Sequence, residues 1–236
     1  MSNKTKFRYE RKYLLDRDAA FLLKQRISYV LHPDASTPDG QYTVSSLYFD
    51  DIYSTSFYQK MNGVLSRDKY RIRFYNGNMD RIRLECKHKH GEMVCKETAT
   101  LSFEEYQMMN RGEYVFMRNQ QPDSVFEKFY ISHVLKHMSP VIMVDYNRQA
   151  YMHHAGNVRI TFDSNILASI PVVNHSYTVL SDENIVMEVK YDRFIPSFVS
   201  GLLTGVPFTQ LAISKYAMSK LAIQGMHINN RYEISK

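Results

Sequence analysis

The sequence has no tryptophan, only two cysteines and no long apolar run, and two of these shortages exclude a class of protein. Cys86 and Cys95 cannot supply the disulfide framework of a small secreted domain in a chain of 236 residues. A Cys pair without a matching His/Cys pair also makes a poor structural zinc site. No run approaches the roughly 18 apolar residues of a membrane-spanning helix. We therefore expect reduced thiols and a cytoplasmic protein without a signal peptide.

The charge balance is basic, with a formal net charge of +6 and a pI of about 9.1. This balance favours an anionic partner, which would be a nucleic acid, a phosphorylated small molecule or a membrane surface. A basic surface kept for solubility is the alternative, so the positions of the charges must decide. We find no helix-turn-helix, RNA-recognition or zinc pattern, and we do not expect nucleic acid as a partner. The length fits one domain over residues 1–236.

Periodicity and turn signals predict about eight mostly antiparallel strands with helices between them and at the end. We expect strands at 7–14, 44–49, 69–75, 81–89, 93–98, 141–151, 158–162 and 184–191. We expect helices after Asp16, near 50–59, after Ser102, from 123 or 124 to 137, and at 194–203 and 209–225. The fold class is α+β. An eight-stranded antiparallel β-barrel, with peripheral helices and a C-terminal helix at one mouth, uses these elements economically.

Charged residues recur at every second position of these strands, which places them on one face. The clearest row is Lys69, Arg71 and Arg73, opposite Tyr70, Ile72 and Phe74. The other rows are Arg8, Glu10 and Lys12; Arg81, Arg83, Glu85, Lys87 and Lys89; Val94, Lys96 and Thr98; Arg159 and Asp163; Glu188 and Lys190.

A two-faced sheet with its charged side in water is the ordinary explanation for such rows. These rows, however, are mostly positive and rich in arginine, and the helices need an apolar surface to cover. If the helices cover the apolar face from outside, the charged face lines a tunnel. Arginine forks and lysine ammonium groups in a tunnel suit a chain of phosphates.

The few acidic residues in these rows have two interpretations. Glu10 and Glu188 are candidate ligands of a divalent cation that prefers oxygen, and simple ion pairing with neighbouring cations is the alternative. Glu85 is expected to pair with Arg83 and Lys87. Four histidines, His88, His90, His153 and His154, lie near hairpin ends, where we expect surface side chains rather than a metal site.

Eight short motifs, in order along the chain, resemble the VTC domain of the triphosphate tunnel metalloenzyme superfamily, in its polyphosphate polymerase branch. The motifs occupy 8–13, 46–50, 69–73, 84–87, 146–148, 158–163, 187–190 and 214–216. The resemblance implies an eight-stranded tunnel, Mn²⁺ or Mg²⁺, and transfer of the ATP γ-phosphate onto inorganic polyphosphate. ATP and polyphosphate or pyrophosphate would be the small-molecule partners, and any membrane protein that exports the product would be a separate chain.

Together, the rows and the resemblance assign candidate site residues. The candidate catalytic cations are Lys12, Arg71, Arg73, Lys87, Arg148 and Arg159. The candidate substrate-binding residues are Lys69, Arg83, Lys96, Tyr146, Lys190, Ser214 and Lys215. Glu188 would be the principal metal ligand, with help from Glu10.

Two positions depart from the family pattern. The superfamily opens with Glu-x-Glu-x-Lys, whereas this chain has Arg8 in place of the first glutamate, which favours phosphate retention over hydrolysis. Ala212 stands where a further basic residue is expected. A triphosphatase on the same scaffold and a non-catalytic sensor of polyphosphate or inositol phosphates remain the alternatives.

Overall fold

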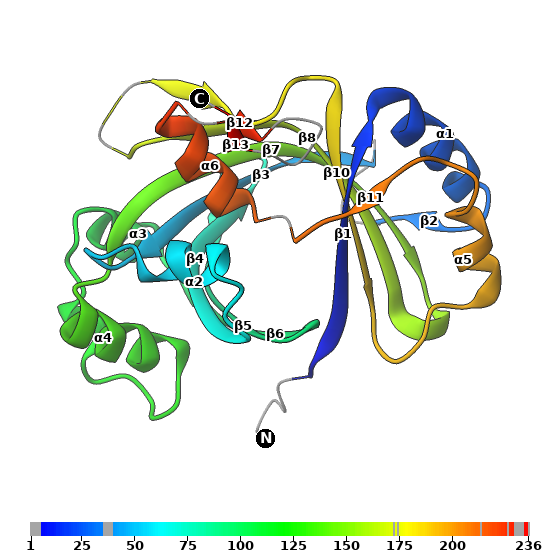
Figure 1. The fold of residues 1–236 in the computed structure, drawn as a ribbon. Helices are drawn as coiled ribbons and strands as arrows, with labels where there is room; N and C mark the ends of the chain where they lie inside the picture. Colours follow the sequence, from blue (N-terminus) through cyan, green and yellow to red (C-terminus); the bar gives the residue numbers. More distant parts are fainter. Residues whose placement is uncertain are drawn as a thin grey trace.

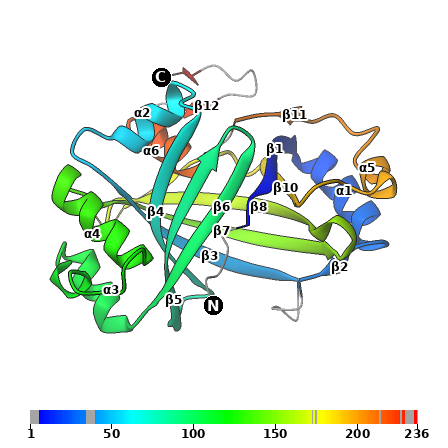
Figure 2. The ribbon, with the colours of Figure 1, turned by 90° about the horizontal axis from the view of Figure 1, so that it is seen from below.

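A computed structural model describes residues 6–34, 40–171, 173, 175–212 and 214–225, with the backbone of 227–228 and 234–235. Eight antiparallel strands close into a ring in the order β7-β3-β4-β5-β6-β1-β10-β8, and β8 pairs back onto β7 (Figures 1 and 2). The ring strands are β1 (Arg8–Asp16), β3 (Gln41–Asp50), β4 (Ser66–Tyr75), β5 (Asn78–His90), β6 (Met93–Leu101), β7 (Ser139–His153), β8 (Val158–Ser169) and β10 (Asn184–Tyr191). This ring confirms the α+β class and the predicted eight-stranded antiparallel barrel.

The ring is closed unevenly. Strands β7 and β8 pair from Met143↔Ser169 to His153↔Val158, whereas β1 and β6 share only Arg8↔Val94 and Tyr9↔Met93. Above Tyr9 the free edge of β1 is taken by the short strand β11 (Thr209–Gln210). The segment that leads into the last helix therefore forms part of the wall.

Helices cover the outside of the ring on two sides (Figures 1 and 2). The outer face of β1, β8 and β10 packs its apolar residues against α1 (Arg17–Ser28) and α5 (Ser197–Leu202). The outer face of β3, β4 and β5 packs against α3 (Phe103–Asn110), the 3-10 turn η1 (Val115–Met117) and α4 (Val125–Lys136). Because the apolar side chains face outward under these helices, the alternate charged rows face the interior of the ring.

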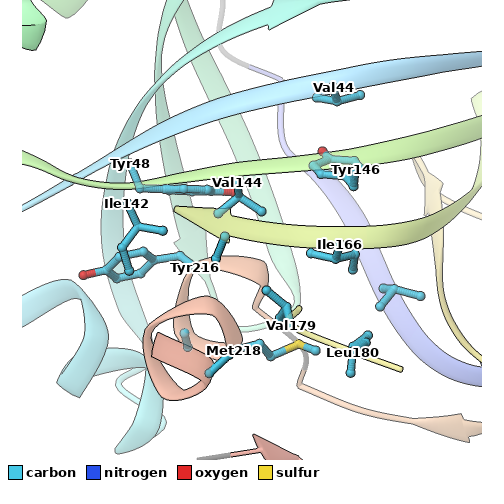
Figure 3. Close-up of a cluster of buried hydrophobic side chains, with 14 of the residues drawn as sticks. Val44, Tyr48, Ile142, Val144, Tyr146, Ile166, Val179, Leu180, Tyr216 and Met218 are labelled. Atoms are coloured by element: carbon cyan, nitrogen blue, oxygen red, sulfur yellow. The ribbon is translucent and has the colours of Figure 1, made fainter. Parts of the chain in front are cut away.

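One end of the interior is filled by an apolar cluster. Helix α6 (Lys215–Ile223) contributes Tyr216 and Met218 to the same buried cluster as Val144 of β7 and Ile166 of β8 (Figure 3). Phe57 of α2 (Thr55–Met61) belongs to the same cluster. The C-terminal helix therefore closes one part of the interior and leaves the charged part beside it.

The predicted helix starts are correct where a capping side chain marks them. Asp16 Oδ1 accepts from the Ala19 N–H at 2.7 Å, Ser102 forms a capping box with Glu105, and Ser124 caps α4. The C-terminal helix begins later than predicted, at 215 rather than 209, because residues 209–210 pair with β1. Helix α5 likewise begins only after Pro196.

Some short elements were not predicted from the sequence. They are β2 (His32–Pro33) on β7, β9 (Ser176–Thr178) on β8, the 3-10 turn η2 (Ala155–Asn157), and the backbone pair β12 (His227–Ile228) and β13 (Ile234–Ser235). Among the described residues, no helix combines the length and apolar character that crossing a membrane requires.

Candidate functional site

A cavity of about 260 Å³ occupies the charged part of the ring interior. Twelve lysine or arginine residues and three glutamates line it. The basic residues are Arg11, Lys12, Lys60, Arg67, Lys69, Arg71, Arg73, Lys87, Lys89, Arg148, Lys190 and Lys215; the acidic residues are Glu10, Glu92 and Glu188. Such an excess of cations in a confined space calls for an anionic ligand.

Most of the residues predicted for the site lie together in this central cavity. Those that line it are Lys12, Arg71, Arg73, Lys87, Arg148, Lys69, Tyr146, Lys190, Ser214, Lys215, Glu10 and Glu188. They come from five ring strands and from the start of α6, which are far apart in the sequence. The alternation argument placed the side chains of β1, β4, β5 and β10 on the correct face, whereas Tyr146, Arg148, Ser214 and Lys215 were expected from the family resemblance.

Three predicted residues lie outside the cavity lining. Arg83 is exposed. The Lys96 ammonium lies 2.6 Å from Glu85 Oε1, and the Arg159 guanidinium lies 2.6 Å from Asp34 Oδ2 and 2.9 Å from the Tyr42 hydroxyl. At the edge of the site, Lys96 therefore holds the Glu85 carboxylate, and Arg159 holds Asp34 and Tyr42.

Glu85 organises the two arginines of β4. Arg71 lies directly opposite Glu85 in the strand register and donates from Nε to its carboxylate at 2.8 Å, while Arg73 lies 3.9 Å away. Glu85 is ion-paired as expected, but its partners are Arg71, Arg73 and Lys96 rather than the flanking Arg83 and Lys87, because facing residues on neighbouring strands are closer than residues two apart on one strand. Glu85 therefore fixes one side of the Arg71 guanidinium, whereas Arg73 is oriented mainly by Ser46 Oγ and the Tyr146 hydroxyl, each at 3.1 Å.

A second buried carboxylate, Asp163, holds two cations at the α6 end of the cavity. Arg148 donates to it from Nε at 2.6 Å and from a terminal nitrogen at 2.8 Å, and Lys215 donates at 2.5 Å. Burial opposes ionisation of Asp163, but Arg148 and Lys215 outweigh it and lower the pKa of Asp163 to about 2. The carboxylate is therefore ionised at neutral pH and orients both cations.

Glu10 and Glu188 share a cluster of lysines on β1, β5 and β10. Lys87 donates to both oxygens of Glu10, at 2.6 and 2.7 Å, and Lys12 lies 3.5 Å from an oxygen of each glutamate. Lys190 bridges the same two carboxylates. Burial opposes ionisation of Glu188, but Lys190 and Lys12 hold its pKa well below the ordinary value. Both carboxylates are therefore charged oxygen donors inside the cavity.

Burial and the excess of positive charge lower the pKa values of two lysines that line the cavity. Burial and the neighbouring Lys12 and Arg67 hold the pKa of Lys69 well below its ordinary value, and burial with Arg67 lowers that of Lys60 to about 8. Among the described residues, Lys69 has no carboxylate in salt-bridge range and donates instead to Ser214 Oγ at 3.0 Å. An anion bound here would supply the counter-charge that these lysines lack.

Sequence reasoning missed some cavity residues. Arg67 lies on the same face of β4 as Lys69, and it was missed because the strand begins three residues before the predicted start, at Ser66. Lys60 lies on helix α2, so strand alternation gave no signal for it. Tyr48 on β3 lies in the 46–50 motif, no residue of which was assigned to the site, and its hydroxyl lies 3.4 Å from an Arg71 nitrogen.

The family comparison agrees with this geometry. The sequence matches the VTC domain family over residues 7–223. This chain belongs to the VTC domain family. The resemblance to the triphosphate tunnel metalloenzyme superfamily is thereby confirmed, and members of that superfamily are typically enzymes that act on phosphate substrates with a divalent ion.

Solved structures with a similar chain path have very different sequences. A Bacillus halodurans protein provisionally assigned as an adenylate cyclase is 12% identical, with a TM-score of 0.49 over 84% of this chain and 86% of that chain. The PH1819 protein of Pyrococcus horikoshii is 11% identical, with a TM-score of 0.45 over 89% of this chain and 97% of that chain. No curated protein matches the sequence.

The VTC domain offers suitable ligands for the divalent ion that its superfamily uses. The Glu10 and Glu188 side chains are each 6% exposed, ionised and turned to the same lysines, and Mg²⁺ is commonly held by one or two carboxylates together with substrate phosphates. The cavity supplies the two carboxylates and the cations that phosphates would need. The residues present therefore fit such an ion.

Of the two positions that depart from the family pattern, Ala212 lines the cavity and Arg8 does not. The Arg8 Nε lies 3.0 Å from Asp192 Oδ1, so its charge is paired at the edge of the ring. Ala212 lines the cavity beside Ser214, and the cation expected there is replaced by a methyl group. The cavity is left with Glu10 and Glu188 as its buried carboxylates among the lining residues.

The start of α6 points its polar groups at the cavity. Ser214 is the N-cap, and its Oγ accepts the Ala217 N–H as well as the Lys69 ammonium group. Helix N-termini carry partial positive charge and free N–H groups, which favour anions. This end of the VTC domain is therefore suited to an anion.

The histidines follow the expectation only in part. His90 and His154 are exposed, and His153 is half-buried. His88 differs, because it lies on the outer face of β5 with Nδ1 2.7 Å from Asp68 Oδ1.

Proposed function

We propose that this VTC domain, acting as one domain over residues 1–236, transfers the γ-phosphate of ATP onto inorganic polyphosphate inside the central cavity. The observation that carries the proposal is the excess of cations over carboxylates in the cavity. Burial and the neighbouring cations lower the pKa of Lys69, and a bound anion would supply the missing counter-charge. Nucleotide and polyphosphate are the partners with matching charge. A cytoplasmic location would agree with the proposed use of ATP, and a partner that moves the product through a membrane would be another chain.

The reaction needs positioning and neutralisation more than acid–base chemistry. A terminal oxygen of the acceptor polyphosphate attacks the γ-phosphorus of ATP, the bond from that phosphorus to the β-γ bridging oxygen breaks, and ADP leaves with the electron pair. The attacking oxygen is already ionised, so no general base has to remove a proton. The products are ADP and a chain one phosphate longer.

The proposed roles follow from the position of each cation. Lys12, Lys87 and Lys190 surround the two glutamates and would turn to phosphate oxygens when the substrate enters. Arg71, Arg73 and Arg148 would bind the transferred phosphoryl group and the leaving diphosphate, with Tyr146 as a hydroxyl donor. Lys69, Ser214 and Lys215 would hold the end of the chain near α6.

Residues at the edge of the site would act indirectly or at the entrance. Lys96 would position Glu85, and Arg159 would act through Tyr42. Arg83, which is exposed, would contribute at most to long-range attraction of the polyanion.

Glu188, with Glu10, would hold the Mn²⁺ or Mg²⁺ ion, which when bound neutralises phosphate charge and fixes the conformation of the triphosphate. The protein residues meanwhile orient the acceptor. The residue at position 8 favours transfer over hydrolysis, because Arg8 replaces a carboxylate that could help to activate water. The charge of Arg8 is compensated by Asp192.

The fate of the γ-phosphate tests the proposal. The protein is incubated with γ-labelled ATP, a pyrophosphate or short polyphosphate primer and Mn²⁺, and the products are separated on a gel. We expect label in long chains that an exopolyphosphatase degrades. Label in free phosphate alone would identify a triphosphatase, and tight polyphosphate binding without ATP turnover across several divalent ions would identify a sensor.

Replacement of Arg71 tests whether the charged rows bind the polyanion. Arg71→Ala should weaken ATP and polyphosphate binding by roughly 10–100-fold, because a charged hydrogen bond contributes about 1.5–3 kcal/mol. Arg83→Ala is the matched control, since it removes the same charge from the neighbouring strand outside the cavity, and we expect a change of less than about threefold. Calorimetric titration measures both, and equal losses in the two variants would contradict the assignment.

A further inference from the structure

A second group of metal-ligating side chains lies on the outer face of the barrel, away from the central cavity. Asp68 on β4 lies opposite His88 on β5, and Cys86, two residues before His88, lies opposite Glu97 on β6. The alternation that sends Lys69 and Lys87 inward sends these four side chains outward. We call Asp68, Cys86, His88 and Glu97 the outer cluster.

Three ligand atoms of the outer cluster converge. One carboxylate oxygen of Asp68, the Cys86 sulfur and a His88 ring nitrogen all lie within 4.8 Å of one another. His88 Nδ1 lies 2.7 Å from Asp68 Oδ1 and 4.0 Å from the Cys86 Sγ. Sulfur, imidazole nitrogen and carboxylate oxygen are the donors that Zn²⁺ takes, and three protein ligands leave a position for water.

A carboxylate lies beside the second ring nitrogen of His88. Nε2 lies 2.9 Å from Glu97 Oε1, within ion-pair range but without the alignment of a hydrogen bond, and Glu97 is held in turn by Lys128 of α4 at 2.8 Å. Histidines that bind metals commonly donate their second ring N–H to a carboxylate, which fixes the tautomer and the orientation of the ring. The outer cluster thus has both a set of ligands and a supporting carboxylate.

We propose that the outer cluster binds one Zn²⁺ ion through Asp68, Cys86 and His88 Nδ1, with Glu97 orienting the imidazole. The ion joins β4 to β5 beside α4 and is independent of the ion proposed for Glu188, which lies on the inner face of β10. Binding releases the thiol proton and any proton on Nδ1 to solvent. The sequence argument weighed zinc only for a cysteine pair with a partner motif, whereas the ligands proposed here come from two strands.

The site is accessible. The Asp68 side chain is 54% exposed and also lines a separate outer cavity of about 210 Å³ between α2, β4 and α4. Cys86 is fully buried and His88 is 23% exposed, so the ion would enter past Asp68 and become largely enclosed.

Cobalt provides a direct test, because thiolate ligation to Co²⁺ produces charge-transfer absorption in the near ultraviolet. The full chain is reduced, freed of metal and titrated with Co²⁺ in excess Mg²⁺, which prefers oxygen ligands and occupies the cavity carboxylates. We expect a thiolate band that saturates at one Co²⁺ per chain and disappears when one equivalent of Zn²⁺ is added. No band in the wild-type protein would overturn the proposal.

Matched variants identify the ligand. The chain has two cysteines, and Cys95 lies outside the set of converging atoms, so Cys86→Ser should lose the band and Cys95→Ser should keep it. Glu97→Gln should weaken Zn²⁺ binding by about 10–100-fold, the usual effect of losing such an orienting carboxylate. A band that follows Cys95 would contradict the assignment, and one that survives both single changes would reflect adventitious binding.

Two further readouts keep the test decisive if Cys86→Ser does not fold, as judged by circular dichroism. Asp68→Asn changes an exposed side chain and should lower Co²⁺ affinity while the barrel stays folded. Zn²⁺ should also slow alkylation of Cys86 more than that of Cys95 in the wild-type protein. Equal alkylation rates with and without Zn²⁺, together with unchanged Co²⁺ affinity in Asp68→Asn, would show that His88 and Asp68 form only an ion pair.

Discussion

Glu188→Gln should lower metal-dependent phosphoryl transfer by roughly 10²–10³-fold, the effect expected when one group that stabilises transition-state charge is removed. Glutamine keeps the shape of the side chain but replaces a charged oxygen donor with an amide, which is a poor ligand for Mn²⁺ or Mg²⁺. Glu10 cannot fully replace it, because Lys87 donates to both oxygens of Glu10. Initial rates measured over a range of Mn²⁺ concentrations test this expectation.

Binding and catalysis should separate in this variant. Removing the carboxylate frees Lys12 and Lys190 from a counter-charge, so polyphosphate affinity measured without metal should be kept or increased. Glu92→Gln is the matched control: it removes the same charge from the cavity lining, but its side chain is 57% exposed. We expect Glu92→Gln to keep its activity within about threefold. Full activity in Glu188→Gln would contradict the metal assignment.

The inner and outer faces of the barrel were predictable from the sequence because strand alternation is a local property. Lys69, Arg71 and Arg73 alternate with Tyr70 and Phe74, and the helices settle which face turns inward by covering the apolar one. The same logic placed Glu188 and Lys190 correctly, since they alternate with buried valine and methionine on β10.

The partners of these side chains were not predictable, because pairing depends on register between strands that are distant in the sequence. Glu85 lies opposite Arg71, and Asp163 meets both Arg148 and Lys215 only after β7, β8 and α6 have packed. The outer cluster was missed for the same reason.

The C-terminal segment shows how tertiary pairing overrides local propensity. Residues 209–223 have helical periodicity, but the edge of β1 is free above Tyr9, and Thr209 and Gln210 pair with it. The helix is thereby delayed until Ser214 can cap it. That delay brings Ser214 and Lys215 to the cavity, so the irregular segment is also the one that completes the site.

Asp163→Asn should lower the free energy of unfolding by about 3–5 kcal/mol, the usual loss when one partner of a buried ion pair is removed. Arg148 and Lys215 would stay buried with their main counter-charge replaced by an amide. Urea unfolding at neutral pH measures the loss. Asp192→Asn is the matched control at the surface end of the sheet, where Asp192 pairs with Lys6 and Arg8, and it should cost no more than about 1 kcal/mol.

The effect of Asp163 should also depend on pH in a defined direction. Its pKa in the folded protein is about 2, below the ordinary value of 3.8, so its contribution is complete above about pH 4 and is lost as the pH falls toward 2. The stability difference between wild type and Asp163→Asn should therefore shrink over that interval, and a constant difference would exclude the buried ion pair as its cause. Inorganic triphosphate should narrow the same difference at neutral pH, because its oxygens would replace the missing carboxylate beside Arg148 and Lys215.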